Sequence, residues 1–272
     1  MNTFGPEKLY GIIGHPLGHT MSPLLHNWGF GEFGIPAVYM AWPTEPDKVA
    51  SFMQTFRNLP ISGASVTIPH KLSVMNYIDQ LTERAEAVGA VNTLYWRGDK
   101  IVGDNTDAAG VSEPLRSCCS QVEKALLIGA GGAARAAIFG LKSLDIKNIY
   151  ITNRTRSKAD DLASEFGIST IDWEDRGDQH FDLIVNSTAL GMSGKNEKIN
   201  PMIMDHQDSK TTVYDLVYNP METVLIKEAR AKGCRVMHGI EMFLHQGMEQ
   251  FRIWTGKDLD ALKARELLLA HL

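Results

Sequence analysis

The sequence predicts an α/β protein of two domains, each with a sheet covered by helices. Short apolar runs alternate with helix-patterned segments along the chain, which is typical of a parallel sheet with helices on both faces. A second series of strands and helices begins near Val122. The length of 272 residues also favours two domains, at about 150 residues for each.

The first half begins with a predicted strand at Leu9 to Ile13, which runs into a loop rich in glycine and proline. Ser22 and Pro23 predict the start of the first helix, with Ser22 as the N-cap and Pro23 at the first helical position. The remaining predicted elements are this helix up to residue 33, strands at 38–42 and 64–68, helices at 47–57 and 81–88, and a hairpin with strands at 91–96 and 100–103.

The second half shows the same alternation of strands and helices. Strands are predicted at 125–128, 148–152, 182–186, 212–216 and 235–238, and helices at 133–144, 157–166 and 224–232. Beyond residue 240 the pattern predicts two helices separated near Thr255-Gly256.

Composition and charge exclude several functional classes. The hydrophobic share of 44% and the charged share of 22% are those of an ordinary globular protein. The formal charge of -5 gives no broad positive field, so we expect neither nucleic acid nor an anionic membrane as a partner. No apolar run approaches the roughly 20 residues that span a bilayer, and the first residues lack the apolar core of a secretory signal.

The cysteines suggest neither a disulfide framework nor a zinc site. There are three, Cys118, Cys119 and Cys234, and no Cys-x-x-Cys pair. We therefore expect a cytoplasmic protein without a bound metal.

A glycine-rich turn follows the predicted strand at 125–128. It reads Gly129-Ala130-Gly131-Gly132-Ala133-Ala134, the G-x-G-x-x-A form of the dinucleotide fingerprint. Gly129 permits the tight turn, Gly131 lets the backbone approach a pyrophosphate, and Ala134 allows close packing of helix on strand. The alternative is an ordinary turn between a strand and a helix, but the order of strand, turn and helix favours an NAD(P)-dependent enzyme.

The end of the next strand favours NADP over NAD. An NAD-selective site usually has a carboxylate there for the ribose 2′-hydroxyl. This chain has Asn153, Arg154 and Thr155, with Lys158 shortly after, and these side chains suit a 2′-phosphate. The alternative is that Arg154 and Lys158 only face solvent, but cations at a helix start oppose its dipole unless an anion binds.

Polar side chains also gather at predicted strand ends in the first half, where ligands of open α/β sheets bind. Each has a structural alternative as a cap, a turn residue or a solvated charge, but together they suit a polyhydroxylated substrate. The set comprises Thr20, Ser22, Ser65, Thr67, Lys71, Asn92, Asp104 and Asp107.

Several of these segments together resemble the shikimate dehydrogenase family, in family order and over essentially the whole chain. The matching segments are 14–23, 66–71, 89–93, 103–107, 129–135, 153–155, 215–220 and 239–246. The resemblance implies a substrate domain of residues 1–106 plus 242–272 and a Rossmann-type NADP domain of residues 107–241, with the C-terminal helices returning to the substrate domain. It also implies reversible reduction of 3-dehydroshikimate to shikimate with NADPH, a step of aromatic amino-acid biosynthesis.

The resemblance further implies a role for individual residues. Lys71 and Asp107 are the expected catalytic pair. Thr20 and Ser22 are expected to bind the substrate carboxylate with Tyr218 beside it, and Thr67, Asn92 and Gln246 to bind the ring hydroxyls. The expected cofactor residues are Gly129, Ala130, Gly131, Gly132, Ala133, Asn153, Arg154, Thr155, Lys158, Asn186, Ser187, Thr188, Gly239 and Met242.

The residue types agree with ketone reduction, which needs a hydride at carbon and a proton at oxygen. The Lys71 ammonium can donate that proton or stabilise the alkoxide, and Asp107 can hold the amine and a substrate hydroxyl in line. Burial would lower the pKa of Lys71 and a neighbouring carboxylate would raise it, so the sequence leaves both roles open.

Two departures from the family pattern bear on the substrate. The family usually has Ser-x-Ser where this chain has Thr20-Met21-Ser22, and Asn where it has Ser65. A quinate or quinate/shikimate dehydrogenase therefore stays an alternative. So do another lysine-dependent two-domain dehydrogenase, such as methylenetetrahydrofolate dehydrogenase, and a non-enzymatic NADP sensor. The chain is expected to be a monomer or a homodimer.

Overall fold

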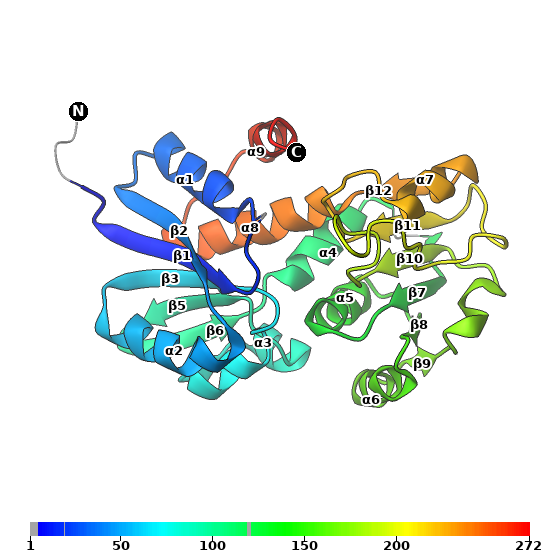
Figure 1. The fold of residues 1–272 in the computed structure, drawn as a ribbon, viewed down its shortest axis with the longest axis horizontal. Helices are drawn as coiled ribbons and strands as arrows, with labels where there is room; N and C mark the ends of the chain where they lie inside the picture. The colour runs from blue at the N-terminus through cyan, green and yellow to red at the C-terminus, as the bar shows by residue number, and fades with distance from the viewer. Residues whose placement is uncertain (1–4, 19, 119–120) are drawn as a thin grey trace. The chain divides into compact units, whose positions relative to one another are not determined.

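The computed structural model describes residues 5–18, 20–118 and 121–272. Two compact units make up the chain (Figure 1). The first unit contains Met1–Thr106 and Gln246–His271, and the second contains Asp107–His245 with Leu272. His19 and Cys119, which belong to the sequence features above, lie outside the described residues.

The first unit is built on a six-stranded mixed sheet in the order β2-β1-β3-β5-β6-β4. Strands β1, β2 and β3 are parallel, whereas β5 is antiparallel to both β3 and β6. The predicted hairpin causes this mixture, because Gly98 turns the chain back at φ 64° between Arg97 and Lys100. The strands are β1 (Lys8–Gly14), β2 (Ala37–Pro43), β3 (Ile61–Val66), β4 (Gln80–Leu81), β5 (Thr93–Arg97) and β6 (Lys100–Asp104).

Helices cover both faces of this sheet. On one face, Phe56 of α2 packs into a core with Ile13 and Val66. On the other, Trp254 of α8 lies 5.2 Å from the ring of Tyr10, and its indole donates to the carbonyl of Leu94. The helices are α1 (Ser22–Glu32), α2 (Val49–Asn58), α3 (Glu83–Val88), α8 (Gly239–Thr255), whose first residues belong to the second unit, and α9 (Ala261–Leu269), with short 3-10 turns at Pro46–Lys48 and Ser73–Tyr77.

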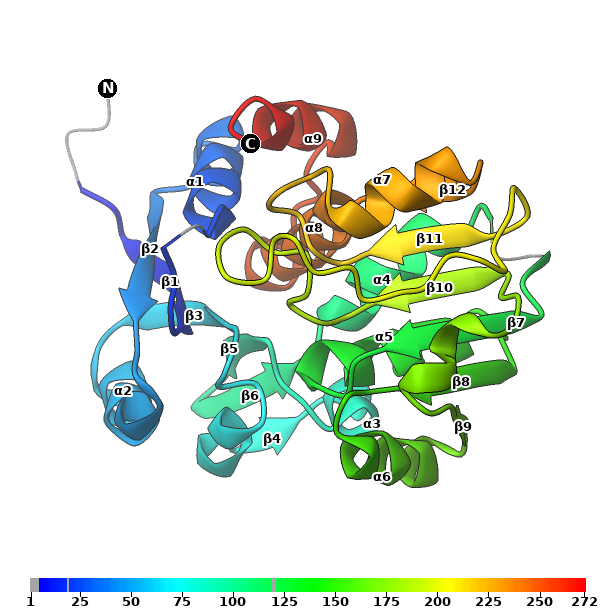
Figure 2. The same ribbon diagram turned by 45° about the vertical axis from the view of Figure 1, so that its right-hand side comes forward.

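The second unit is a doubly wound parallel sheet in the order β12-β11-β10-β7-β8-β9 (Figure 2). Its central strands are buried on both faces, which explains their continuous apolar sequence. The strands are β7 (Lys124–Ile128), β8 (Asn148–Thr152), β9 (Ser169–Thr170), β10 (Leu183–Asn186), β11 (Thr212–Asp215) and β12 (Arg235–Met237), and the helices α4 (Asp107–Leu115), α5 (Gly132–Ser143), α6 (Arg156–Phe166) and α7 (Val224–Ala231), with a 3-10 turn at Glu174–Gly177.

The predicted two-domain α/β fold class is confirmed, but one helix was missed and one local expectation was wrong. Helix α4 was not predicted, because Gly110 and Pro114 lower the helix propensity of this segment. Ser22 was expected to be an N-cap, but it is the first residue of α1. The cap is Met21, which makes no side-chain bond.

The described part of the chain contains neither a membrane-spanning helix nor a metal-binding cluster. No helix there is long and apolar enough to cross a bilayer. No cluster of three or more His, Cys, Asp or Glu side chains there could hold a metal ion.

His26 on α1 is a fully buried titratable group in the first unit. Its ring stacks on Tyr39, with centroids 4.5 Å apart, and lies 5.0 Å from the ring of Trp254. Burial lowers the pKa of His26 to about 3, and the Gln250 side chain opposes only part of this shift. The folded protein therefore holds the imidazole neutral at pH values where an unfolded chain protonates it.

His26 should make folding stability sensitive to acid. Between the folded pKa of about 3 and the unfolded value of about 6.5, the unfolded chain binds the extra proton, so stability falls as the pH falls through this window. Going from pH 7 to pH 5 should cost about 2 kcal/mol from this group. Urea unfolding across this range should show a shallower pH slope for His26→Phe than for the parent. His271→Phe, at an exposed position, is the control. An unchanged slope in His26→Phe would contradict the assignment.

Candidate active site

The sheet topology of the first unit brings most of the expected substrate residues to one edge. Because β1, β3 and β6 run in the same direction, their carboxyl ends meet there, and antiparallel β5 contributes its amino end. Ser65 pairs with Thr93, and Thr93 pairs with Asp104, so the strand ends lie in one row. The expected residues at this edge are Thr20 and Ser22 after β1, Thr67 and Lys71 after β3, and Asn92 before β5.

Thr20 and Ser22 place two hydroxyls together at the start of α1. Their Oγ atoms are 3.3 Å apart, and the backbone amide of Ser22 donates to the Thr20 hydroxyl over 3.3 Å. The N-cap residue Met21 offers no side-chain oxygen to the free backbone amides of this helix end. Hydroxyls beside a helix N-terminus are suited to a carboxylate.

The turn that carries Lys71 is fixed by bonds on all sides. The Thr67 amide donates to the carbonyl of Ile13 over 2.9 Å, and the buried ring of His70 bonds through Nε2 to the carbonyl of Thr44 over 2.6 Å. The carbonyl of Lys71 accepts from the amide of Val91 over 2.8 Å. The lysine backbone is therefore held in place before any substrate binds.

Asn92 is 2% exposed and uses its amide carbonyl inside the protein. Its Oδ1 accepts from the Thr106 amide over 2.8 Å and from the Thr93 hydroxyl over 2.7 Å, while Nδ2 donates to the Thr106 hydroxyl over 2.9 Å. Any contact with a ring hydroxyl therefore falls to the Nδ2 amino group. Asn92 also fastens the chain segment that leads into Asp107.

The two carboxylates of the Gly103–Asp107 segment have different roles. Arg84 donates two hydrogen bonds to Asp104, from Nε to Oδ1 over 2.9 Å and from Nη2 to Oδ2 over 2.8 Å. The Thr82 hydroxyl donates a third to Oδ1 over 2.7 Å. Burial alone would raise the pKa of Asp104, but the bonds from Arg84 hold it below its ordinary value. Asp104 is thus a structural residue. Asp107, 3% exposed, is the first residue of α4 and belongs to the second unit.

A buried chain of hydrogen bonds under this edge was not foreseen from the sequence. The Tyr39 hydroxyl donates to Ser65 over 2.6 Å, Ser65 donates to Oε1 of Gln250 over 2.8 Å, and Gln250 Nε2 donates to the carbonyl of Asn92 over 3.1 Å and to the Thr93 hydroxyl over 3.0 Å. The available signals were a tyrosine inside an apolar strand and a second glutamine one helical turn after Gln246.

In the second unit the expected cofactor residues follow the carboxyl ends of the parallel strands. β7 lies between β8 and β10, so the strand order reverses there, and ligands of doubly wound sheets bind at such a switch point. The turns at this edge are 129–131 after β7, 153–155 after β8, 186–188 at β10, 216–218 after β11 and 238–239 after β12.

The glycine turn fits a dinucleotide. Gly129 has φ 111°, and a Cβ there would lie 2.7 Å from the hydroxyl of Ser187. Gly131 is exposed and faces open space, so a phosphate can approach its backbone. Helix α5 begins at Gly132 without a side-chain cap, and Ala134 is fully buried against the sheet. Of the other residues expected at the cofactor, Ala130 lies in the same turn and Ala133 is the second residue of α5.

The basic residues after β8 differ in their ionic partners. Arg156 bonds to Asp160 and Asp172, whereas Arg154 and Lys158 are exposed and have no ionic partner among the described residues. The Thr155 cap position makes no side-chain bond to α6, and the Asn153 amide donates to the carbonyl of Thr155 over 2.9 Å. This end of α6 therefore presents uncompensated positive charge.

The remaining expected residues lie in or beside the other turns. Asn186 is fully buried, and the Ser187 hydroxyl donates to the carbonyl of Ile128 over 2.8 Å. The ring of Tyr218 lies 5.3 Å from that of Phe243, and burial raises the pKa of Tyr218. The others are Thr188 in the turn after β10, Gly239 and Met242 in the first turn of α8, and Gln246 further along α8 in the first unit.

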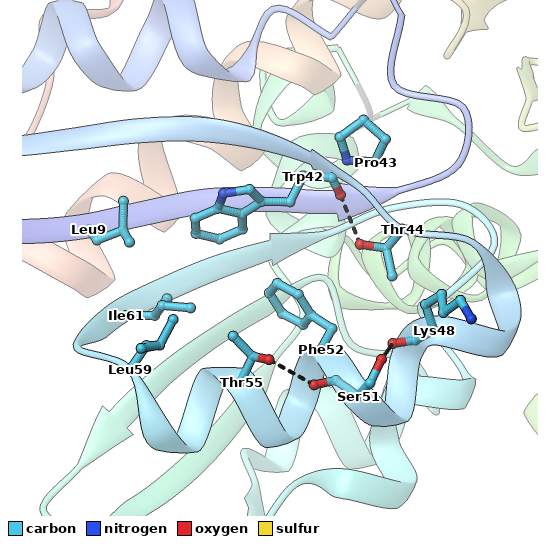
Figure 3. Close-up of a pocket in the computed structure, with 10 residues that line it drawn as sticks. All are labelled: Leu9, Trp42, Pro43, Thr44, Lys48, Ser51, Phe52, Thr55, Leu59 and Ile61. Atoms are coloured by element: carbon cyan, nitrogen blue, oxygen red, sulfur yellow. Dashed lines mark hydrogen bonds between the residues drawn. The ribbon is translucent and has the colours of Figure 1, made fainter.

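A separate cavity of about 390 Å³ opens beside α2, and none of the expected site residues line it (Figure 3). Its walls are mainly apolar, with Trp42 and Phe52 among them. The hydroxyls of Thr44, Ser51 and Thr55 all donate to backbone carbonyls. The cavity therefore offers few donors to a polar substrate, and the strand ends described above are the candidate site.

Comparison with known proteins identifies the family. Three family models match, described as the shikimate dehydrogenase substrate binding domain over residues 12–94, shikimate / quinate 5-dehydrogenase over 115–218, and the shikimate 5'-dehydrogenase C-terminal domain over 239–269. The chain is 79% identical over 272 residues to the shikimate dehydrogenase (NADP(+)) of Maridesulfovibrio salexigens, and the alignment covers all of both chains.

Solved structures agree with this result. A shikimate dehydrogenase in complex with NADP+ superposes with a TM-score of 0.90 at 34% identity, covering 97% of this chain and 95% of that one. The enzyme from Thermus thermophilus, in complex with NADP(H) and shikimate, has a TM-score of 0.88 at 31% identity, covering 97% and 99%. The chain belongs to the shikimate dehydrogenase family.

Proposed function

We propose that the chain is an NADP-dependent shikimate dehydrogenase, which reduces 3-dehydroshikimate to shikimate with NADPH and catalyses the reverse reaction in aromatic amino-acid biosynthesis. The observation that carries the proposal is the identity of 79% over the full length of a relative named for this activity. The geometry supports it, because hydroxyls, an amide and a lysine share one sheet edge and a phosphate-binding turn lies in the second unit.

The substrate is bound by polar groups that match its own. We assign the carboxylate to Thr20 and Ser22 at the start of α1, with Tyr218 beside it, because hydroxyls and free backbone amides donate to anions. Thr67, Gln246 and the Nδ2 group of Asn92 take the ring hydroxyls. Each side chain is a neutral donor or acceptor, as recognition of a polyol requires.

The cofactor is bound along the switch-point edge of the second unit. The turn from Gly129 to Ala133 and the uncapped start of α5 hold the pyrophosphate, while Arg154 and Lys158 hold the 2′-phosphate. Asn186, Ser187, Thr188, Gly239 and Met242 border the rest of the molecule. When bound, NADPH supplies the hydride that reduces the substrate ketone.

Lys71 and Asp107 provide the proton chemistry. The Lys71 ammonium donates a proton to the carbonyl oxygen as it becomes a hydroxyl, and in the oxidation direction the amine takes that proton back. The Asp107 carboxylate accepts a hydrogen bond from the substrate hydroxyl. The backbone of Lys71 is bonded to Val91, and Thr106, the residue before Asp107, is bonded to Asn92. These bonds position both chain segments before proton transfer.

The substrate and cofactor assignments are tested together by initial rates. We expect shikimate with NADP to give the highest kcat/KM, with NADP preferred over NAD by at least about 10-fold, because each charge-assisted bond to the 2′-phosphate contributes roughly 1.5–3 kcal/mol. Quinate is the second candidate substrate, since Thr20 and Ser65 depart from the residues usual at these positions. Faster turnover of quinate would show that quinate, and not shikimate, is the substrate. A preference for NAD would refute the proposed contacts with the 2′-phosphate.

Replacing either member of the proposed catalytic pair should abolish most turnover. Lys71→Ala and, separately, Asp107→Ala should lower kcat by about 10²–10⁴-fold, the usual range for loss of a general acid or base, while the Kd for NADP stays within about twofold. Lys48→Ala is the control, because Lys48 is exposed and pairs with Asp47. Near-normal turnover in either variant would exclude that residue. Cofactor binding without turnover in the parent protein would favour a sensor.

The two arginines flanking the start of α6 allow a matched test of the 2′-phosphate site. Arg154→Ala should raise the KM for NADPH by about 10-fold or more and leave the KM for NADH nearly unchanged, because only NADPH carries the phosphate. Arg156→Ala should affect both cofactors little, since Arg156 bonds to Asp160 and Asp172 instead. Equal effects of Arg154→Ala on the two cofactors would refute the contact.

A further inference from the structure

Asp215 ends strand β11 as a fully buried carboxylate that the proposed reaction does not use. It accepts three hydrogen bonds from three segments of the second unit. Asn186 Nδ2 and the Val217 amide donate to Oδ1 over 2.9 and 3.1 Å, and the Thr223 hydroxyl donates to Oδ2 over 2.6 Å. Burial raises the pKa of Asp215, and the three hydrogen bonds oppose this shift. Burying a carboxylate costs free energy, which these hydrogen bonds offset.

On one side, Asp215 determines which way the Asn186 amide points. Because a carboxylate only accepts hydrogen bonds, the amino group of Asn186 must face it and the carbonyl must face away. That carbonyl accepts from the Thr188 amide over 3.1 Å and from the Thr188 hydroxyl over 2.7 Å. The Thr188 hydroxyl in turn accepts from the Leu190 amide over 3.1 Å. The turn after β10 is therefore folded around an amide that Asp215 orients.

On the other side, Asp215 holds the chain that follows its own strand. Its bond to the Val217 amide fixes the backbone immediately before Tyr218. Thr223 is the N-cap of α7, and its hydroxyl accepts from the Ile226 amide while it donates to Asp215. The peptide of Leu216 and Val217 also lies directly against Gly239, where a Cβ would come within 2.5 Å of both carbonyl oxygens. One carboxylate thus bonds to two cofactor-edge segments, the end of β10 and the residues after β11, and to the cap of α7.

We infer that Asp215 is a positioning residue for NADP binding, which acts by orienting Asn186 and the Leu216–Tyr218 backbone and so shaping the turns that border the cofactor. The inference rests on the proposed function for the identity of the ligand. It differs from a purely structural role, because Asp215 orients Asn186, which is assigned to the cofactor, in addition to bonding to the cap of α7.

The test is Asp215→Asn, a substitution that preserves size and removes the charge. With its amino group towards Thr223, whose hydroxyl can accept, the amide leaves Asn186 and Val217 on a neutral acceptor in place of a charged one; in the other orientation it loses the bonds from Asn186 and Val217. We expect the Kd for NADPH, measured by isothermal titration calorimetry, and the KM for NADPH to rise by about 10-fold or more, as for loss of a hydrogen bond to a charged group. We expect kcat to fall by a smaller factor.

Thr223→Val is the matched control, because it removes one bond to Asp215 and the cap of α7 but leaves the bonds to Asn186 and Val217. It should lower Tm, yet leave the Kd for NADPH within about twofold of the parent. If Asp215→Asn lowers Tm with an unchanged Kd for NADPH, the residue is structural and the inference is wrong. The same conclusion follows if Thr223→Val weakens NADPH binding as much as Asp215→Asn does.

A second variant covers the case in which Asp215→Asn does not fold. Asn186→Asp has nearly the same shape and breaks the same bond from its other end, since it replaces the Nδ2 donor by a second acceptor. It should also raise the Kd for NADPH by about 10-fold or more, and an unchanged Kd would overturn the inference. Failure of the proposed function is visible separately, because the parent protein would then bind NADPH but would not oxidise shikimate with NADP.

Discussion

The parallel hydrogen-bond ladder between adjacent strands is the constraint on which both sites depend. It places β1 beside β3 in the first unit and β7 beside β10 in the second, each pair running in the same direction. Parallel strands bring their carboxyl ends to one edge, and the chain leaves each strand there in a turn or a helix start. The backbone pairing of the strands therefore brings residues that are distant in the sequence to a common edge, and no bond between their side chains is needed.

Polar groups at these edges are held by the protein before a ligand arrives. Asn92 has its carbonyl occupied by Thr93 and Thr106, and the Lys71 backbone is bonded to Val91. Both carboxylate oxygens of Asp104 accept hydrogen bonds from Arg84. A polar residue whose bonds are all made inside the protein supports the site, whereas one with a free donor or acceptor can contact the substrate. Residues that are already held in place also lower the entropy cost of binding.

Local signals explain which features were predictable from the sequence. The strand, glycine turn and helix around Gly129 follow from backbone requirements of neighbouring residues, and the hairpin at Gly98 does as well. Helix α4 escaped prediction, because tertiary packing overrides the weak propensity of Gly110 and Pro114. Gln250 could not be assigned, because its bond to Asn92 spans 158 residues and a single sequence contains no record of that proximity. Asp215 has partners only 2, 8 and 29 residues away, but no sequence pattern shows that all three bond to one carboxylate. The roles of Lys71 and Asp107 stay predictions.

The hydrogen bonds from Tyr39 through Ser65 to Gln250 all point the same way, with each group donating to the next. Position 65 must therefore accept from a phenol and donate to an amide oxygen at once. A serine hydroxyl meets both demands, and so would an asparagine amide, whereas alanine or valine meets neither. An asparagine at position 65 would thus preserve the direction of the chain, and only pairs of substitutions that keep this direction should be tolerated at positions 65 and 250.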